Sequence, residues 1–211
     1  RSTRAGRALS RGEAGKVYDR HYFDRWYRGP NALRGAEALV RHVSLAVATA
    51  ESILDRPVET VLDVGCGEGR WQPVLRTLRP EVSYLGLDPS EYSVARFGAE
   101  RNLLRGSFGD LELHAFEDPF DLVVCADVLH YLGDEEILVG IDTLADLVGG
   151  SAVVEVFTDA DPVSGDREAF HLRPPDWYRR VFREAGLVSI GLQMYVHQET
   201  AELLEAMDRP C

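Results

Sequence analysis

The chain predicts a three-layer α/β fold, with a mostly parallel sheet and helices on both of its faces, and three observations carry this expectation. A buried apolar run at 60–64 leads directly into a glycine-rich turn. Further apolar runs follow at 82–87, 121–126 and 151–157. Stretches of helical periodicity separate these runs, and strands that alternate with helices form βαβ units whose strands lie parallel in one sheet.

The same periodicities place the other elements of the sheet region. Helices are expected near 69–78, 90–101 and 134–148, and a weak strand near 102–107. Pro174-Pro175-Asp176 begins a helix that Gly186 ends, and a terminal helix covers 199–207. Between them, Leu187–His197 predicts one strand, unless this run folds back on itself near Gly191 and supplies a second.

Two helices are expected before the sheet. Tyr18, Tyr22 and Trp26 follow one another at helical spacing, which indicates a helix from Val17 to Tyr27. An amphipathic pattern from about 32 to 54 predicts the second helix. Residues 1–14 lack a periodic apolar face and are expected to be disordered. We therefore divide the chain into an arm (1–14), N-terminal helices (15–56) and the sheet region (57–211) of a single domain.

Composition excludes several classes of protein. With 211 residues and 45% hydrophobic content, the chain is long enough for one buried core. No apolar run approaches the roughly 18 residues of a membrane-spanning helix, and no signal peptide is visible. The three cysteines form no C-x-x-C pair, so neither a disulfide framework nor a metal site is expected. These features favour a cytoplasmic protein that does not bind membranes.

The charge is strongly negative and unevenly distributed. A net charge of −12 argues against a nucleic-acid partner, because phosphate binding needs clustered basic side chains. Residues 1–34 nevertheless hold nine basic and three acidic side chains. This segment is either an arm that binds an anionic ligand or a solvated terminus that folds back on an acidic body. The sequence leaves the oligomeric state open.

The first strand and its turn carry the strongest functional signal. Asp63 lies within the strand, and the turn that follows has the form Gly-x-Gly-x-Gly. Glycine lets the backbone approach a ligand closely and adopt positive φ, so a strand, this turn and a helix make a nucleotide cradle. Asp88 ends the next strand, where an acid can bind ribose hydroxyls.

Together with Gly109-Asp110-Leu111 and the run 120–132, these motifs resemble the class I S-adenosylmethionine-dependent methyltransferases, over roughly residues 57–192. The resemblance implies a Rossmann-like sheet under an N-terminal helical lid. It also implies that Asp63 orders the glycine loop and can order the cofactor's ammonium group, that Asp88 binds the ribose and that Asp110 reaches the adenine amino group. The cofactor-binding residues expected on this basis are Asp63, Gly65, Cys66, Gly67, Gly69, Asp88, Pro89, Ser90, Asp110, Leu111, Cys125, Ala126 and Tyr18.

Other interpretations of the glycine turn stay open. Nicotinamide enzymes use related turns to hold a pyrophosphate. Asp63 and Glu68 place negative charge where that pyrophosphate would lie, whereas S-adenosylmethionine presents an ammonium and a sulfonium. A nicotinamide-dependent oxidoreductase is thus disfavoured. An inactive cofactor-binding partner subunit is the second alternative.

The run from Phe120 to Leu132 resembles the family's fourth strand, whose end faces the reactive methyl group. It contains His130 and Tyr131, which we take as catalytic candidates. A histidine there either acts as a general base or merely packs. The Asn- or Asp-Pro-Pro-aromatic segment of amino-methylating DNA enzymes is absent from the run, so a nucleobase amine is a poor acceptor. Methyl transfer can also proceed by orientation and desolvation alone.

The acceptor is expected to be a small molecule, methylated on an oxygen, nitrogen, sulfur or carbon atom that the sequence does not identify. Tyr22 and Trp26 contact it if the N-terminal aromatic helix folds over the cofactor, and they pack on the sheet edge otherwise. A long polar loop follows the fifth strand, at the edge where open α/β folds bind ligands. From this loop His171 and Arg173 are candidate contacts to the acceptor.

Overall fold

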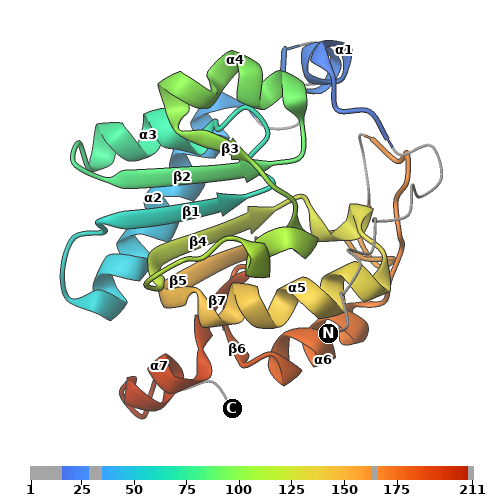
Figure 1. The fold of residues 1–211 in the computed structure, drawn as a ribbon. Helices are drawn as coiled ribbons and strands as arrows, with labels where there is room; N and C mark the ends of the chain where they lie inside the picture. Colours follow the sequence, from blue (N-terminus) through green and yellow to red (C-terminus); the bar gives the residue numbers. More distant parts are fainter. Residues whose placement is uncertain (1–15, 29–34, 163–165, 209–211) are drawn as a thin grey trace, which may run out of the picture.

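The computed structural model describes residues 16–28, 35–162 and 166–208, and its centre is a seven-stranded sheet (Figure 1). The spatial order of the strands is β3-β2-β1-β4-β5-β7-β6. All neighbours from β3 to β5 pair in parallel, whereas β7 is antiparallel to both β5 and β6. The strands are β1 (Thr60–Val64), β2 (Ser83–Asp88), β3 (Leu103–Arg105), β4 (Phe120–Ala126), β5 (Val148–Glu155), β6 (Leu187–Gly191) and β7 (Met194–His197).

Helices cover both faces of the sheet, which confirms the predicted three-layer architecture (Figure 1). On one face lie α2 (Ala36–Leu54), α3 (Trp71–Leu78) and α4 (Glu91–Arg101), and on the other α5 (Asp134–Asp146) and α6 (Pro175–Glu184). Alternate residues of each strand point to opposite faces. Leu62 packs with the α5 and α6 layer, and its neighbour Val61 packs with the α2 layer.

The C-terminal run at 187–197 does fold back on itself. Gly191, Leu192 and Gln193 have φ values of 94°, 54° and 59°, and this left-handed turn separates β6 from β7. β7 then inserts between β5 and β6, with Ala152 opposite Tyr195. The seventh strand that the sequence pattern left in doubt is therefore present, and the expectation of a single strand is wrong. The terminal helix is shorter than expected, as α7 (Gln198–Leu203).

The N-terminal segment is less regular than its aromatic spacing predicts. Asp19 caps α1 (Arg20–Phe23) by accepting a hydrogen bond from the Tyr22 amide at 3.0 Å, and a π-helical stretch, η1 (Asp24–Arg28), follows. Both lie beyond the carboxyl ends of the parallel strands (Figure 1). The expected disordered arm at 1–14 and the expected start of the second helix near Ala32 lie outside the described residues.

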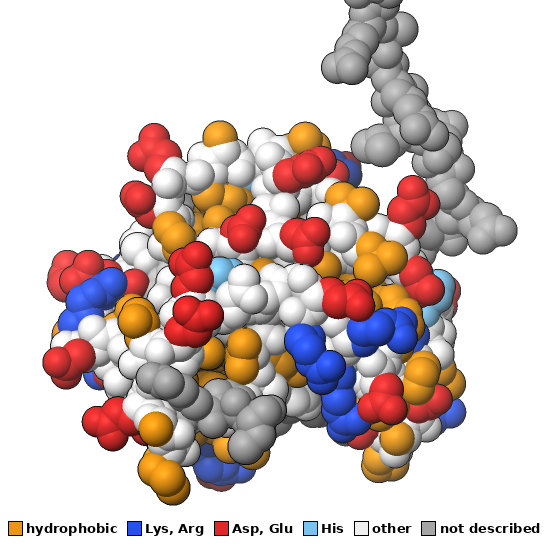
Figure 2. All heavy atoms as spheres, turned by 90° about the horizontal axis from the view of Figure 1, so that it is seen from below, with side chains coloured by type: hydrophobic (Ala, Val, Ile, Leu, Met, Phe, Trp, Pro, Cys, Tyr) orange, Lys and Arg blue, Asp and Glu red, His pale blue; other side chains and the backbone are white. Residues whose placement is uncertain are grey.

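Two short 3-10 helices, η2 (Phe108–Leu113) and η3 (Leu129–Tyr131), lie in the connections after β3 and β4. Within the described ranges, no helix is long and apolar enough to cross a membrane, and no group of histidine, cysteine and acidic side chains is arranged to hold a metal ion. Figure 2 shows acidic side chains spread over the face seen there, with a group of basic side chains at its lower right and further basic side chains at its edges.

Candidate functional site

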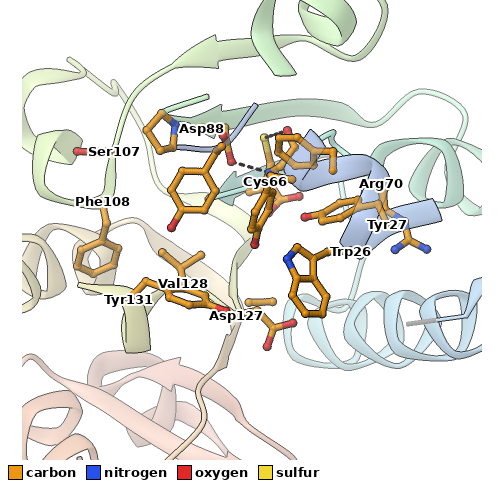
Figure 3. Close-up of a pocket in the computed structure, with 18 of the residues that line it drawn as sticks. Trp26, Tyr27, Cys66, Arg70, Asp88, Ser107, Phe108, Asp127, Val128 and Tyr131 are labelled. Carbon is orange, nitrogen blue, oxygen red and sulfur yellow. Dashed lines mark hydrogen bonds between the residues drawn. The ribbon is translucent and has the colours of Figure 1, made fainter. Parts of the chain in front are cut away.

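A cavity of about 290 Å³ lies at the carboxyl edge of the sheet, beneath α1 and η1 (Figure 3). The sheet contributes the glycine loop after β1 and the ends of β2 and β4, and the N-terminal segment forms the opposite wall. In Figure 3, Ser107 and Phe108 lie at one end, and Trp26, Tyr27 and Arg70 at the other. Of the predicted site residues, the cavity is lined by Tyr18, Tyr22, Trp26, Asp63, Gly65, Cys66, Gly67, Asp88, Pro89, Ala126 and Tyr131.

The glycine loop needs the glycines that the sequence places there. Gly65 and Gly67 have φ values of 71° and 57°, in the left-handed region that side chains disfavour. A Cβ atom on Gly65 would lie 2.2 Å from Cγ2 of Val128, and one on Gly67 would lie 2.4 Å from the Tyr27 hydroxyl oxygen. The loop is therefore a cradle that any side chain would fill.

Asp88, rather than Asp63, orders this loop. Its carboxylate accepts a hydrogen bond from the Gly67 amide at 2.7 Å (Figure 3). It accepts a second one from the Ser90 amide at 2.9 Å. Burial raises the pKa of Asp88 to about 6, against the lowering by these two amides. The hydrogen bonds of the described residues thus give no support to the expectation that Asp63 orders the loop. Asp88 lines the cavity, as the ribose assignment requires.

Asp63 is held instead by a neighbouring tyrosine. The Tyr84 hydroxyl donates to its carboxylate at 2.7 Å, and the Asp63 residue is only 3% exposed. Burial raises the pKa of Asp63 to about 7, and the repulsion from Asp88 adds to this effect. A cationic ligand group in the cavity would lower that pKa again, since opposite charge favours the ionised form.

We expect this buried acid to make stability fall with rising pH. In the unfolded chain Asp63 titrates near its ordinary pKa of about 3.9, and in the folded chain near 7. Between these values only the folded state keeps the proton. The stability that the protonated Asp63 contributes is therefore fully present below about pH 4 and is lost progressively as the pH rises to about 7. Relative to Asp63→Asn, the free energy of unfolding of the wild type should decline across this window and then level off. Urea titrations at several pH values measure it, and parallel curves for the two proteins would contradict the assignment.

Glu68 is neutralised rather than presented to a ligand. Its carboxylate pairs with the Arg28 guanidinium at 2.5 Å, so Glu68 does not supply the charge against a pyrophosphate that the sequence suggested. Other acidic side chains supply the negative charge of the cavity. Asp63, Asp88, Asp127 and Glu136 all line the cavity, where Arg70 is the only basic lining residue among those described.

The end of the cavity near β3 differs from the expected pattern. Ser107 and Phe108 line it, whereas Asp110 and Leu111 do not. The 3-10 turn of η2 directs the Asp110 carboxylate back to the Ser107 hydroxyl, which donates to it at 2.7 Å, and Leu111 is fully buried in the core. The adenine contact of Asp110 thus gains no support from the geometry, and Ser107 and Phe108 occupy its place.

His130 does not reach the cavity. It is 1% exposed, its ring stacks on Phe170 at 4.6 Å, and its Nδ1 accepts from the Phe157 amide at 3.4 Å. Burial first, and then the charges of Lys16 and Arg173, lower the pKa of His130 to about 4. The histidine is neutral and enclosed, and this favours packing over the role of a general base. Tyr131, one residue later, does line the cavity.

We therefore expect His130→Ala to act on stability. Removing a buried, stacked ring should lower the free energy of unfolding by about 2–4 kcal/mol, as other large-to-small core changes do. Turnover per folded molecule should be largely retained, once thermal denaturation has defined the folded fraction. A loss of about 10²-fold or more in turnover with unchanged stability would instead support general-base catalysis.

Two candidates from the polar loop lie away from the cavity. Arg173 is 5% exposed and bonds to the Asp134 carboxylate at 2.7 Å and to the Leu132 carbonyl oxygen at 2.6 Å. It joins the loop to η3 and α5 and is unavailable to an acceptor. His171 is exposed, and its backbone amide donates to the His130 carbonyl oxygen at 2.8 Å.

Three predicted cofactor-binding residues, Gly69, Ser90 and Cys125, do not line the cavity and contact other parts of the protein. Gly69 has a φ of 67°, and a Cβ atom on it would lie 2.8 Å from Cδ2 of Leu103. Ser90 caps α4 by accepting from the Ser93 amide at 3.1 Å, and its hydroxyl donates to the Tyr18 carbonyl oxygen at 2.6 Å. Cys125 is fully buried within β4.

Sequence patterns alone did not identify several cavity residues. Tyr27 packs against the glycine loop, and Asp127 follows β4 with a φ of 62°. Asp127 lies in the run that resembles the family's fourth strand, so its position in the sequence could have indicated a place at the cavity. The sequence does not indicate its left-handed backbone conformation. Glu136 comes from the first turn of α5, where an acid is ordinary at a helix N-terminus.

A family model matches the central part of the chain. Residues 62–152, which run from β1 into β5, match the family model described as a methyltransferase domain. Over these residues the chain is similar to methyltransferase domains. The match includes the glycine loop, Asp88 and the end of β4. Beyond the matched residues, the sheet continues from β5 through the antiparallel strands β7 and β6 at its edge.

Two curated relatives are similar to part of the chain. A ribosomal protein L11 methyltransferase from Cupriavidus necator is 40% identical over 70 residues, 33% of this chain and 23% of the relative. A trans-aconitate 2-methyltransferase from Deinococcus radiodurans is 35% identical over 83 residues, 39% of this chain and 31% of the relative. The aligned part thus spans about a quarter to a third of the length of these relatives.

A solved structure shows the likeness of the fold over most of the chain. The magnesium protoporphyrin IX methyltransferase of Synechocystis PCC 6803, with bound S-adenosylhomocysteine, has a TM-score of 0.56 and 17% sequence identity. The superposition covers 85% of this chain and 94% of that enzyme.

Proposed function

We propose that the chain is an S-adenosylmethionine-dependent methyltransferase that acts on a small-molecule acceptor. The observation that carries the proposal is the glycine cradle closed by Asp88, at the bottom of a cavity lined by four carboxylates. The cradle is open only because Gly65 and Gly67 lack Cβ atoms. The acids suit a ligand with an ammonium and a sulfonium, since opposite charges nearby favour the ionised form of each carboxylate.

Each part of the cavity then has a task. Asp88 would bind the ribose hydroxyls, Ser107 and Phe108 would hold the adenine, and Asp63 with the glycine loop would face the amino-acid end. When bound, S-adenosylmethionine supplies a methyl group on a positively charged sulfur, which is a good leaving group. The aromatic wall of α1 and η1 excludes water from that region and orients the reactants, so no dedicated base is required.

The acceptor side is proposed to lie between the N-terminal aromatic wall and η3. Tyr22 and Trp26 come from the first, and Tyr131 from the second. A cavity closed on several sides by side chains suits a small molecule better than a protein or nucleic-acid segment. We also propose a cytoplasmic location, since Cys66 and Cys125 are buried free thiols.

Transfer of a labelled methyl group tests the activity. The protein is incubated with S-adenosylmethionine labelled on the methyl group and with a panel of amines, carboxylates, phenols and thiols. Product formation that follows protein concentration and is reduced in Asp88→Asn supports the proposal. Cofactor binding without product, together with stable association with a second chain, would favour an inactive partner subunit. Binding of NADH alone would favour an oxidoreductase.

A further inference from the structure

Lys16 is the only lysine of the chain, and its ammonium group lies in a cage of aromatic rings. Its Nζ lies 3.6 Å from the centroid of the Tyr131 ring, 5.2 Å from that of Tyr22 and 5.3 Å from that of Tyr18. The Asp166 carboxylate forms a salt bridge with it. Three rings and one carboxylate around an ammonium form the arrangement that binds alkylammonium groups in general.

The cage is enclosed and held in place from several elements. The side chains of Lys16 and Asp166 are 5% and 7% exposed. The Tyr131 hydroxyl donates to the Asp166 carbonyl oxygen at 3.2 Å, and the Asp166 carboxylate also accepts from the Glu168 amide at 3.0 Å. Lys16 itself donates to the Glu168 carbonyl oxygen at 3.3 Å. The carboxylate is thus positioned by the 166–168 segment independently of Lys16.

The cage and the cavity share three walls. Tyr18, Tyr22 and Tyr131 all line the cavity as well as surrounding the Lys16 ammonium. A ligand with its cationic head between these rings would therefore extend its remaining part into the cavity. In Figure 3, Tyr131 lies beside Val128 and Asp127 at the end of β4, the edge at which the reactive methyl group is expected.

We propose that the cage of Tyr18, Tyr22, Tyr131 and Asp166 is the head-group subsite for a methyl acceptor that carries an ammonium group, and that Lys16 occupies this subsite when no acceptor is bound. The proposal rests on the proposed methyltransferase function and names its substrate class. It commits to an amine or alkylammonium compound over a carboxylate or phosphate, which the Asp166 carboxylate would repel.

Exchange of Lys16 for such a head group is energetically reasonable. A buried ion pair contributes little net stability, because the loss of hydration offsets most of the attraction between its charges. Burial is also the largest influence on the pKa of Lys16, and it lowers that pKa despite the nearby Asp166. An alkylated ammonium is more weakly hydrated than a primary one, so it loses less hydration free energy when it enters the cage. The strongly acidic body of the chain further favours the approach of cations.

Calorimetric titration of the full chain with tetramethylammonium chloride tests the subsite directly. Lys16→Met removes the resident ammonium and should bind tetramethylammonium at least about tenfold more tightly than the wild type. A second change, Asp166→Asn, should remove most of this gain. In the Lys16→Met background, Tyr131→Phe should keep binding, because it retains the ring, whereas Tyr131→Leu should weaken it.

The controls show whether a change in binding comes from the charge of the ligand, from its size or from a loss of folding. The neutral compound 3,3-dimethylbutan-1-ol carries a tert-butyl group, which has about the size of a trimethylammonium group. It should bind none of these variants measurably better than the wild type, and thermal denaturation confirms that each is folded. Equal tetramethylammonium affinity in wild type and Lys16→Met would overturn the subsite. So would binding of the neutral compound to Lys16→Met as tight as that of tetramethylammonium.

Titration of the same samples with S-adenosylmethionine distinguishes this inference from the function on which it rests. Binding of S-adenosylmethionine without tetramethylammonium binding to Lys16→Met would overturn the subsite and leave the methyltransferase proposal intact. Binding of tetramethylammonium without S-adenosylmethionine binding would overturn the acceptor assignment together with the proposed function.

Discussion

Gly67→Val is expected to abolish measurable binding of S-adenosylmethionine. A Cβ atom at this position would lie 2.4 Å from the Tyr27 hydroxyl oxygen and 3.1 Å from its Cζ atom. The φ of 57° adds backbone strain for a β-branched residue. The valine would therefore displace Tyr27 or the loop itself, and its methyl groups would fill the space that the cofactor's amino-acid end requires. Calorimetric titration measures the loss.

Gly133→Ala is the matched control for this variant. Nothing lies within 4 Å of a Cβ atom on Gly133, and its φ of −67° is accessible to alanine. It should keep the wild-type affinity. Thermal denaturation of both variants shows whether they fold. A folded Gly67→Val protein with wild-type affinity would place the cofactor site elsewhere.

Asp88→Ala should weaken the binding of S-adenosylmethionine by about 1.5–3 kcal/mol, the usual loss for charged hydrogen bonds, or roughly 10- to 150-fold. Two effects add here. The carboxylate that we assign to the ribose is lost, and the Gly67 amide loses the acceptor that orders the loop. Asp88→Asn keeps an oxygen for one amide but removes the charge, so its effect should be smaller.

Asp110→Ala serves as the comparison, because it removes the same group from a residue that does not line the cavity. Its effect on affinity should be small. Unchanged affinity in Asp88→Ala would contradict the ribose assignment. A large loss in Asp110→Ala would restore the adenine contact that the motif implies and would show that η2 rearranges on binding.

The parallel part of the fold was predictable because its signals are local. The run at 60–64 coincides with β1, and the glycines after it have the positive φ that their residue type suggests. The place of Asp88 at the cavity was also predictable, since the ends of neighbouring parallel strands meet at one edge of a sheet. Each of these inferences needed only spacing and residue type.

The remaining features depend on contacts between distant segments. The left-handed turn at Leu192 and Gln193 has no glycine at those positions, so the hairpin was hard to predict. His130 resembled a base because its sequence neighbours resemble a motif, but Phe157 and Phe170 enclose it from elsewhere in the chain. Lys16 carries no signal as a single charge in the sequence, because its cage assembles only in the folded chain.

Side-by-side calorimetric titration with S-adenosylmethionine, S-adenosylhomocysteine and NADH tests the central claim most directly. The cradle, the Asp88 carboxylate and the acidic lining predict micromolar binding of the first two ligands at one site per chain, and no binding of NADH. Binding of NADH alone would contradict the account and would assign the glycine loop to a dinucleotide.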